Sequence, residues 1–185
     1  MSVLVVTASR LGSTTRIGER IAARLATNGI HAVAHDAVVV GDLGPYRVVI
    51  LGSGVYAGHW LPDARRFVER HRSRLMQRSV WLFSSGPVGD TATRHEAEEL
   101  AEVGRLRSSL RARGHRTFAG ALDRAAIAEA DLGRLERFVA EHLVPEGDYR
   151  DWDAIDAWAD EIARTIGADL GPTDGREAPE PLLAR

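Results

Sequence analysis

The chain has 185 residues, of which 44% are hydrophobic and 27% are charged, a composition that predicts one globular domain and excludes global disorder or a fibrous repeat. Its formal net charge is -2, with arginine supplying all 24 basic residues, so the charge balance indicates no nucleic-acid-binding surface. Because cysteine is absent, disulfides, thiolate nucleophiles, iron–sulfur clusters and thiolate zinc sites are excluded, and any redox chemistry must come from a bound cofactor.

A strand, a helix and a second strand are expected at the start of the chain. Val3–Val6 is a continuous apolar run, which is typical of a strand buried on both faces of a parallel sheet. The helix is predicted from Ser13 to the stop signal at Asn28-Gly29, because its apolar residues recur four apart. A weaker strand is predicted at His31–Asp36.

The same alternation of strands and helices continues along the chain. Strands are predicted at 48–51, 80–83 and 115–119, and helices from about Pro62 to Leu75 and at 96–113, 132–143 and 151–166. Parallel neighbouring strands require helical crossovers, so this order predicts a doubly wound α/β domain over residues 1–168. The remaining residues, 169–185, are rich in Pro and Glu and are expected to be a disordered tail.

The first of three polar loops follows the first predicted strand. In doubly wound sheets ligands bind outside the carboxyl ends of the strands. The candidate binding residues of this loop are Ser9, Arg10, Leu11, Gly12, Ser13 and Thr14. Hydroxyls and backbone N–H groups at a helix start would hold a phosphate, with charge from Arg10 or Arg16. Ser13-Thr14 would equally serve as an ordinary helix cap, and the loop has neither a Walker motif nor a GxGxxG fingerprint.

The second loop, from Gly52 to Trp60, combines glycines with aromatic residues. Its candidate ring-binding residues are Ser53, Gly54, Val55, Tyr56, Ala57 and Gly58. Glycines would let the backbone approach a flat ring, and Tyr56 and Trp60 offer aromatic faces. Trp60 would alternatively pack on the core at the start of the next helix. His59 is the one candidate for proton transfer, and a plain surface position fits it equally.

The third loop follows the strand at 80–83. Its candidate residues for the other wall of the ring pocket are Ser84, Ser85, Gly86, Pro87 and Gly89. The alternative is a plain loop that leads into the next helix.

Four segments carry a resemblance that covers about residues 2–166. They are VLVVTASRLGSTTRIGERIA, VILGSGVYAGHWLPDARRFVERHR, WLFSSGPVGD and EGDYRDWDAIDAWADEIA. Together they resemble the flavodoxin-domain family that includes the menaquinone-dependent protoporphyrinogen oxidases. Tyr56-Ala57 departs from this pattern, because those oxidases have an Arg and a Tyr there.

The resemblance implies a fold, a cofactor and a site. The implied fold is a flavodoxin-like three-layer αβα sandwich with a five-stranded parallel sheet in the order 2-1-3-4-5. The implied cofactor is noncovalently bound FMN, with a deazaflavin coenzyme as the alternative. Carried over by position, Ser9 to Thr14 hold the phosphate, Ser53 to Gly58 face the isoalloxazine ring, and Ser84 to Gly89 complete the pocket.

The reaction that the resemblance implies is an oxidoreduction. Electrons would pass from a reduced organic substrate, through FMN, to a quinone or another acceptor. The alternatives are an electron carrier between protein partners and a cofactor-free interaction module. Because electron-carrying flavodoxins are strongly acidic, the nearly neutral charge of this chain favours the enzyme.

The expected partners and location follow from the same reasoning. A small-molecule electron donor and a quinone are expected, no nucleic acid is expected, and a homodimer is left open. The N-terminal apolar run is too short for a signal peptide, and no stretch approaches the ~20 apolar residues of a membrane span. A cytoplasmic protein without an integral membrane segment is therefore predicted, and transient membrane contact through a quinone pool is left open.

Overall fold

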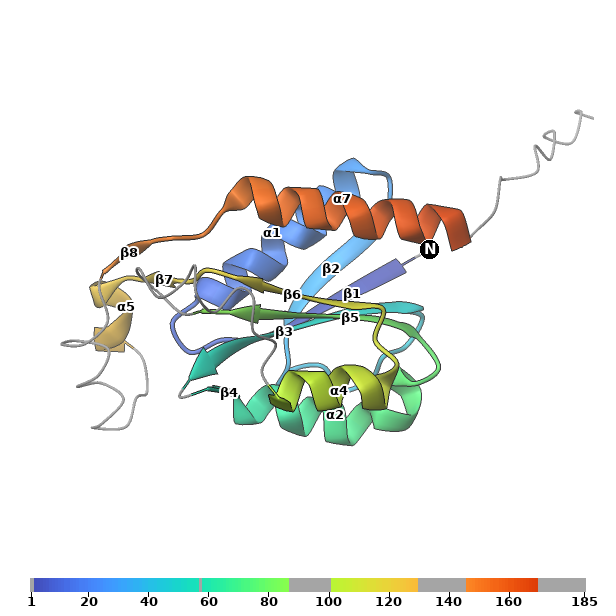
Figure 1. Cartoon of the computed structure of the whole chain (residues 1–185), viewed down its shortest axis with the longest axis horizontal. Helices are drawn as coiled ribbons and strands as arrows, with labels where there is room; N and C mark the ends of the chain where they lie inside the picture. The colour runs from blue at the N-terminus through green and yellow to red at the C-terminus, as the bar shows by residue number, and fades with distance from the viewer. Residues whose placement is uncertain (1, 57, 87–100, 130–145, 170–185) are drawn as a thin grey trace, which may run out of the picture.

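A parallel sheet forms the centre of the molecule (Figure 1). The computed structural model describes residues 2–56, 58–86, 101–129 and 146–169. The parallel strands are β1 (Ser2–Ala8), β2 (His31–Asp36), β3 (Val48–Tyr56), β5 (Ser79–Ser85) and β6 (Gly114–Phe118). Their order in the sheet is β2-β1-β3-β5-β6, which confirms the predicted order 2-1-3-4-5. The sheet has one further strand, β4 (His59–Trp60), which pairs antiparallel with β3.

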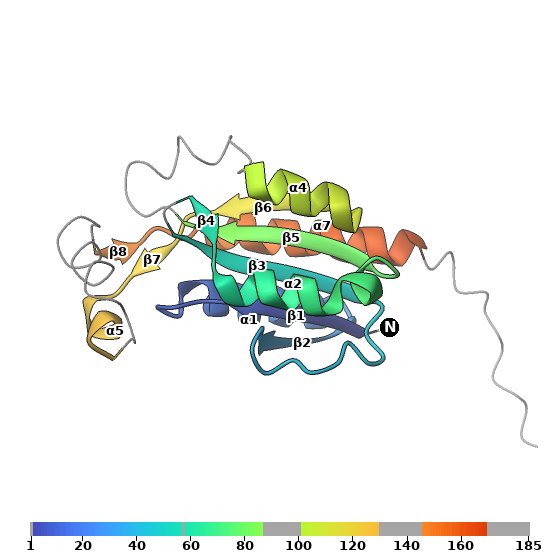
Figure 2. The same cartoon turned by 90° about the horizontal axis from the view of Figure 1, so that it is seen from below.

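Helices cover both faces of the sheet, as the doubly wound pattern predicts (Figures 1 and 2). One face carries α1 (Ser13–Thr27) and α7 (Trp152–Asp169), and the other carries α2 (Pro62–Leu75) and α4 (Ala101–Leu110). Alternate side chains of β1 enter separate cores, with Val3 and Val5 beside α1 and α7 and with Leu4 and Val6 beside α2 and α4. The unbroken apolar run of β1 therefore reflects burial on both faces.

The strand β3 is longer than predicted, because it continues through Gly52 and Gly54 to Tyr56. The prediction of a loop beginning at Gly52 is wrong, and packing is the reason. A Cβ atom at Gly52 would lie 2.0 Å from the ring of Phe83 on the neighbouring strand. At Gly54 it would lie 3.0 Å from the ring of Tyr56 and 3.3 Å from the Thr14 hydroxyl. These glycines make room for side chains within a strand, and neither has a positive φ.

Three short elements that were not predicted lie beyond the carboxyl ends of the parallel strands (Figure 1). They are β7 (Ala121–Leu122), α5 (Arg124–Glu129) and β8 (Gly147–Asp148), of which β7 and β8 pair antiparallel. The predicted helix at 132–143 and residues 170–185 of the predicted tail lie outside the described residues. So does the first part of the helix predicted at 96–113.

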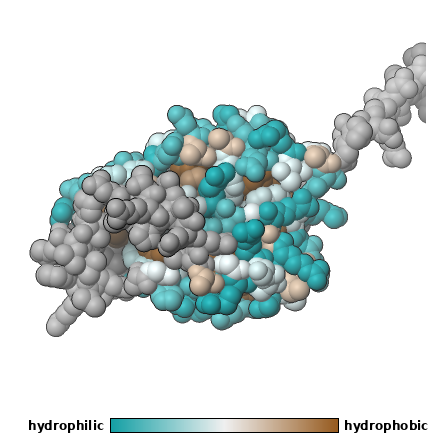
Figure 3. Space-filling model, viewed as in Figure 1, coloured by the Kyte–Doolittle hydropathy of each residue, from teal (hydrophilic) through white to brown (hydrophobic). Residues whose placement is uncertain are grey.

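None of the helices in the described part of the chain has the length and apolarity needed to cross a bilayer. The side of the molecule drawn in Figure 3 is mainly hydrophilic where it is described, with small hydrophobic areas between the elements.

Candidate functional site at the carboxyl edge of the sheet

The three polar segments found in the sequence meet at one edge of the sheet. The register of β1 with β3 places Ala8 opposite Ser53, and the register of β3 with β5 places Gly54 opposite Ser85. The strand order reverses at this point, because β1 lies between β2 and β3. Such a switch point is where doubly wound sheets bind their ligands.

The N-terminus of α1 opens onto this edge without a side-chain cap. Gly12 occupies the N-cap with φ +79°, a left-handed conformation that favours glycine, and within the described part of the chain no side-chain hydrogen bond caps the helix. The first turn contains no acidic residue. Ser13 instead accepts a hydrogen bond from the backbone N–H of Ala121 at 2.9 Å, and Thr14 is buried. The helix-cap interpretation of Ser13-Thr14 is therefore not what the structure has.

The first loop is connected to the β3–β4 hairpin through an arginine. The Arg10 guanidinium carbon lies 5.7 Å from the centre of the Tyr56 ring, within the range of a cation–π interaction. Ser9, Arg10, Leu11 and Tyr56 are all partly buried, whereas Gly12 is exposed. The loop therefore presents its backbone near Gly12 to solvent and holds its arginine against the hairpin.

Ser53 and Gly58 shape the hairpin. The Ser53 hydroxyl is fully buried, donates a hydrogen bond to the carbonyl oxygen of Gly54 at 2.9 Å, and accepts one from the N–H of Leu61 at 2.9 Å. Gly58 has φ +77° at the turn between Tyr56 and His59, which are paired across the hairpin. Ser53 thus holds the hairpin internally, and Val55 and Tyr56 are the partly buried side chains nearest the turn.

Trp60 packs in the core, which was the alternative prediction for this residue. Its residue exposure is 1%, and its indole N–H donates a hydrogen bond to the Ser84 hydroxyl at 2.9 Å. The same hydroxyl lies 3.0 Å from Nε2 of His115. Trp60 offers no free face to a ring, and the Ser84 hydroxyl is engaged with two neighbouring side chains.

The end of β5 brings backbone groups rather than exposed side chains to the edge. Ser85 is buried, and Gly86 follows it with φ +113°. The Gly86 N–H donates a hydrogen bond to the carbonyl oxygen of Phe118 at 2.9 Å. Three predicted site residues, Ala57, Pro87 and Gly89, lie outside the described residues.

His59 lies on β4 with most of its side chain exposed. Its Nδ1 is 3.3 Å from a carboxylate oxygen of Glu102 on α4, and the same oxygen accepts a hydrogen bond from the N–H of Trp60 at 3.3 Å. The contacts of His59 therefore link the hairpin to α4. Proton transfer by His59 stays a prediction.

The strands β7 and β8 were not predicted from the sequence, and β7 contacts the start of α1. Ala121 of β7 contacts Ser13, and Ala121 is paired with Asp148 of β8. Hydrogen bonds from Arg150 hold the pKa of the Asp148 carboxyl below its ordinary value, and the charge of Arg16 in α1 lowers it further. The signal that the sequence offered was the close spacing of Asp148 and Arg150 in the segment EGDYRDW. Among the described residues, no cluster of His, Asp or Glu could hold a metal ion.

Comparisons with known proteins agree with this fold. The rubredoxin oxygen:oxidoreductase of Desulfovibrio gigas aligns with 92% of this chain at a TM-score of 0.61 and 13% identity, but this chain spans only 37% of it. A flavodoxin from the domain Archaea aligns with 90% of this chain and 99% of its own, at a TM-score of 0.60 and 12% identity. Flavodoxin 2 from Bacillus cereus also aligns with 90% of this chain and 99% of its own, at a TM-score of 0.56 and 19% identity.

These low identities establish a shared fold and no more. No curated protein sequence matches the chain significantly. A family model, described as a flavodoxin domain, matches residues 4–143, which is most of the chain. The strand order, the two helical layers and this match lead to one conclusion: the chain belongs to the flavodoxin-domain family.

Proposed function

We propose that the protein binds FMN at the carboxyl edge of the sheet and transfers electrons through it. The observation that carries the proposal is the start of α1, which lies at the switch point between β1 and β3 and has neither a side-chain cap nor an acidic residue in its first turn. A helix N-terminus carries a partial positive charge and unpaired N–H groups, so an uncapped one favours a phosphate.

The residues at the edge fit the phosphate of FMN. The Ser13 hydroxyl accepts one hydrogen bond from Ala121 and can still donate its own proton to a phosphate oxygen. Apart from its own chain neighbours, no atom of the described residues lies within 4 Å of the position that a Cβ of Gly12 would occupy, so the backbone there is open to close approach. Ser9 and the N–H groups of the first turn of α1 complete the set of donors, and Arg16 lies exposed on the same turn.

The flat ring would lie between the hairpin and the end of β5. Val55 and Tyr56 are the partly buried side chains on one side, and the backbone at Ser85 and Gly86 forms the other. When bound, FMN accepts and donates electrons at its ring. In this arrangement the protein binds, orients and partly shields the ring, and Arg10 keeps Tyr56 in position through the cation–π contact.

The sequence resemblance supports a finer proposal about the reaction. It favours the oxidation of a reduced organic substrate, with a quinone or another acceptor receiving the electrons. A carrier between protein partners is the second candidate, because structural neighbours such as the archaeal and Bacillus cereus proteins are flavodoxins. Stepwise reduction of the loaded protein distinguishes them: two-electron steps support the enzyme, and separate one-electron steps support the carrier.

The test of FMN binding uses the full chain. We expect the purified protein to be yellow, and denaturation should release a chromophore with the mass of FMN. If it is purified without cofactor, titration with FMN should quench the flavin fluorescence at a stoichiometry of one. A deazaflavin coenzyme, titrated in parallel, tests the alternative cofactor. A colourless protein that takes up neither compound would contradict the proposal.

A further inference from the structure

Arg150 is a buried arginine whose guanidinium is bound on one side only. Its side chain is 5% exposed, although it follows β8 at the edge of the molecule. Nε and Nη2 donate to the two carboxylate oxygens of Asp148 at 2.7 and 2.6 Å, and the guanidinium carbon lies 4.5 Å from the centre of the Trp152 ring. These contacts fix the plane of the guanidinium.

The remaining nitrogen of this guanidinium, Nη1, is buried and has no hydrogen-bond acceptor in the part of the chain that the structure describes. Leaving a charged donor buried without an acceptor is costly, so such groups usually mark a missing partner. Because the donor is cationic and already held in a plane, an anionic oxygen is the partner that its chemistry favours.

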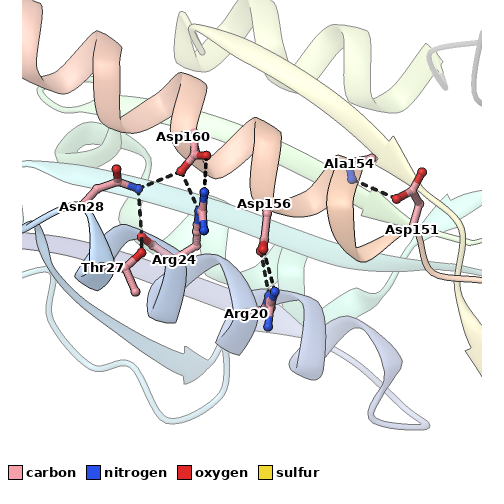
Figure 4. Close-up of polar contacts among 8 residues, drawn as sticks. All are labelled: Arg20, Arg24, Thr27, Asn28, Asp151, Ala154, Asp156 and Asp160. Atoms are coloured by element: carbon pink, nitrogen blue, oxygen red, sulfur yellow. Dashed lines mark hydrogen bonds and ion pairs between the residues drawn. The ribbon is translucent and has the colours of Figure 1, made fainter.

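The position of Arg150 follows from the way that α1 and α7 pack. Figure 4 shows two bidentate ion pairs between them, Arg20 with Asp156 and Arg24 with Asp160. Both pairs are separated by 136 residues, so the helices run parallel with a constant offset. The same offset places Trp152, the first residue of α7, level with Arg16 in the first turn of α1, and Arg150 precedes Trp152 by two residues.

Direct contacts place the same segment beside the phosphate loop. The Ala121 N–H donates to Ser13 at 2.9 Å, and Ala121 is paired with Asp148, which holds Arg150. Arg16 is close enough for its charge to lower the pKa of Asp148. The positive charge of Arg16 thus lies near both Asp148 and the positive end of the α1 dipole.

We propose that Nη1 of Arg150 is a ligand of the phosphate at the start of α1, and that Arg150 makes the site selective for a phosphorylated flavin over riboflavin. This rests on the proposed binding of FMN. Asp148 and Trp152 position the guanidinium before the ligand arrives, so little conformational freedom is lost on binding. Bonds to phosphate would satisfy the nitrogen that is otherwise buried without an acceptor.

The test compares Arg150→Gln with wild type in the cofactor-free full chain. FMN and riboflavin dissociation constants are measured by quenching of flavin fluorescence. We expect the FMN constant to rise about 100-fold, as for the loss of a charge-assisted hydrogen bond, and the riboflavin constant to stay unchanged. Arg20→Gln is the matched control, since Arg20 also makes bidentate bonds to an aspartate but lies farther along α1 from the loop, and the change should alter neither constant.

A merely structural role for Arg150 predicts a different result. In that case Arg150→Gln would raise the dissociation constants of FMN and riboflavin by the same factor, and this result would overturn the proposal. Arg150→Lys keeps the charge but loses the planar guanidinium, so it should show an intermediate loss of affinity for FMN and none for riboflavin. This variant replaces Arg150→Gln in the test if the Gln variant does not fold.

Inorganic phosphate separates this proposal from FMN binding itself. If wild type binds no flavin, the proposed function fails. Millimolar inorganic phosphate should still raise the Tm of wild type and Arg20→Gln, and should raise that of Arg150→Lys less. Equal effects of phosphate on all three proteins, or none on wild type, would overturn the role of Arg150.

Discussion

The helices α1 and α7 begin at the same edge of the sheet and lie side by side, yet their first turns are built in opposite ways (Figure 4). In α7 the Asp151 carboxylate accepts a hydrogen bond from the N–H of Ala154 at 2.9 Å, and Asp153 adds a second negative charge in the first turn. In α1 the N-cap is Gly12, and the first turn has neither an acid nor a capping side chain.

Both helices have the same dipole, so the difference lies in where the compensating negative charge comes from. The start of α7 contains its own compensating negative charges, which stabilise the helix and the fold without a ligand. The start of α1 lacks one and is flanked by Arg16, so its charge is balanced best by an anion from outside. On the proposed function, the caps distinguish the structural helix start of α7 from the ligand-binding start of α1.

The largest effect is expected when an acidic residue is introduced into the first turn of α1. We expect Thr15→Glu to weaken FMN binding at least ~100-fold, because a carboxylate at the first turn repels the phosphate. The same change should raise the free energy of unfolding of the cofactor-free protein by about 0.3–1 kcal/mol, because it complements the dipole. Fluorescence titration and urea unfolding measure the two effects, with Thr15→Gln as the uncharged control. Unchanged FMN affinity in the Glu variant would place the phosphate elsewhere.

Removing the N-cap of α7 should lower stability and leave FMN binding nearly unchanged. Asp151→Ala is expected to lower the free energy of unfolding by about 1 kcal/mol, the usual cost of losing an N-cap, and to leave the FMN dissociation constant within about twofold. Asp151→Asn keeps a capping oxygen and should recover most of the stability. A large loss of FMN affinity in the Ala variant would show that the two helix starts do not act independently.

The smallest effect is expected from the ion pairs that keep the helices in register. Hydrogen bonds from Arg24 and Asn28 lower the pKa of Asp160 from 3.8 to about 2. A carboxyl whose pKa is depressed in the folded state stabilises the protein above its unfolded pKa and loses this contribution as the pH falls through its folded pKa. The Tm of Asp160→Asn should thus be slightly below that of wild type at pH 7, by less than in Asp151→Ala.

The difference between Asp160→Asn and wild type should disappear as the pH falls from about 4 to about 2. High salt should reduce this difference at pH 7, because the pair is partly exposed and therefore partly screened. A difference that persists at pH 2 would mean that Asp160 acts through packing rather than through its charge.

Much of the fold could be predicted from local patterns. Continuous apolar runs mark β1, β3 and β5 because a strand in a parallel sheet is buried on both faces, and that condition acts on every residue. The end of α1 at Asn28 and the start of β2 at His31 were predicted for the same kind of reason, since helix stops depend on a few adjacent residues.

The site was harder to predict, because the same residue types serve two purposes at the edge of the sheet. Ser53 and Ser84 have the hydroxyls that a ligand site needs, but they bond to Leu61 and Trp60 instead. Gly52 has the freedom of a loop glycine, but it makes room for Phe83 in the neighbouring strand. Neither choice is visible locally, since each depends on a partner on another part of the chain.

The residue pattern alone predicts the alternation of strands and helices, the buried central strands and the polar segments that follow them, because burial in regular elements imposes a local periodicity on the chain. Two features became apparent only in the folded chain: the Ser13 hydroxyl at the start of α1 accepts a hydrogen bond from Ala121 instead of capping the helix, and the Arg150 side chain is buried. The first feature depends on a contact between residues 108 positions apart, and the parallel packing of α1 against α7 brings the segment that contains Arg150 to the same edge of the sheet.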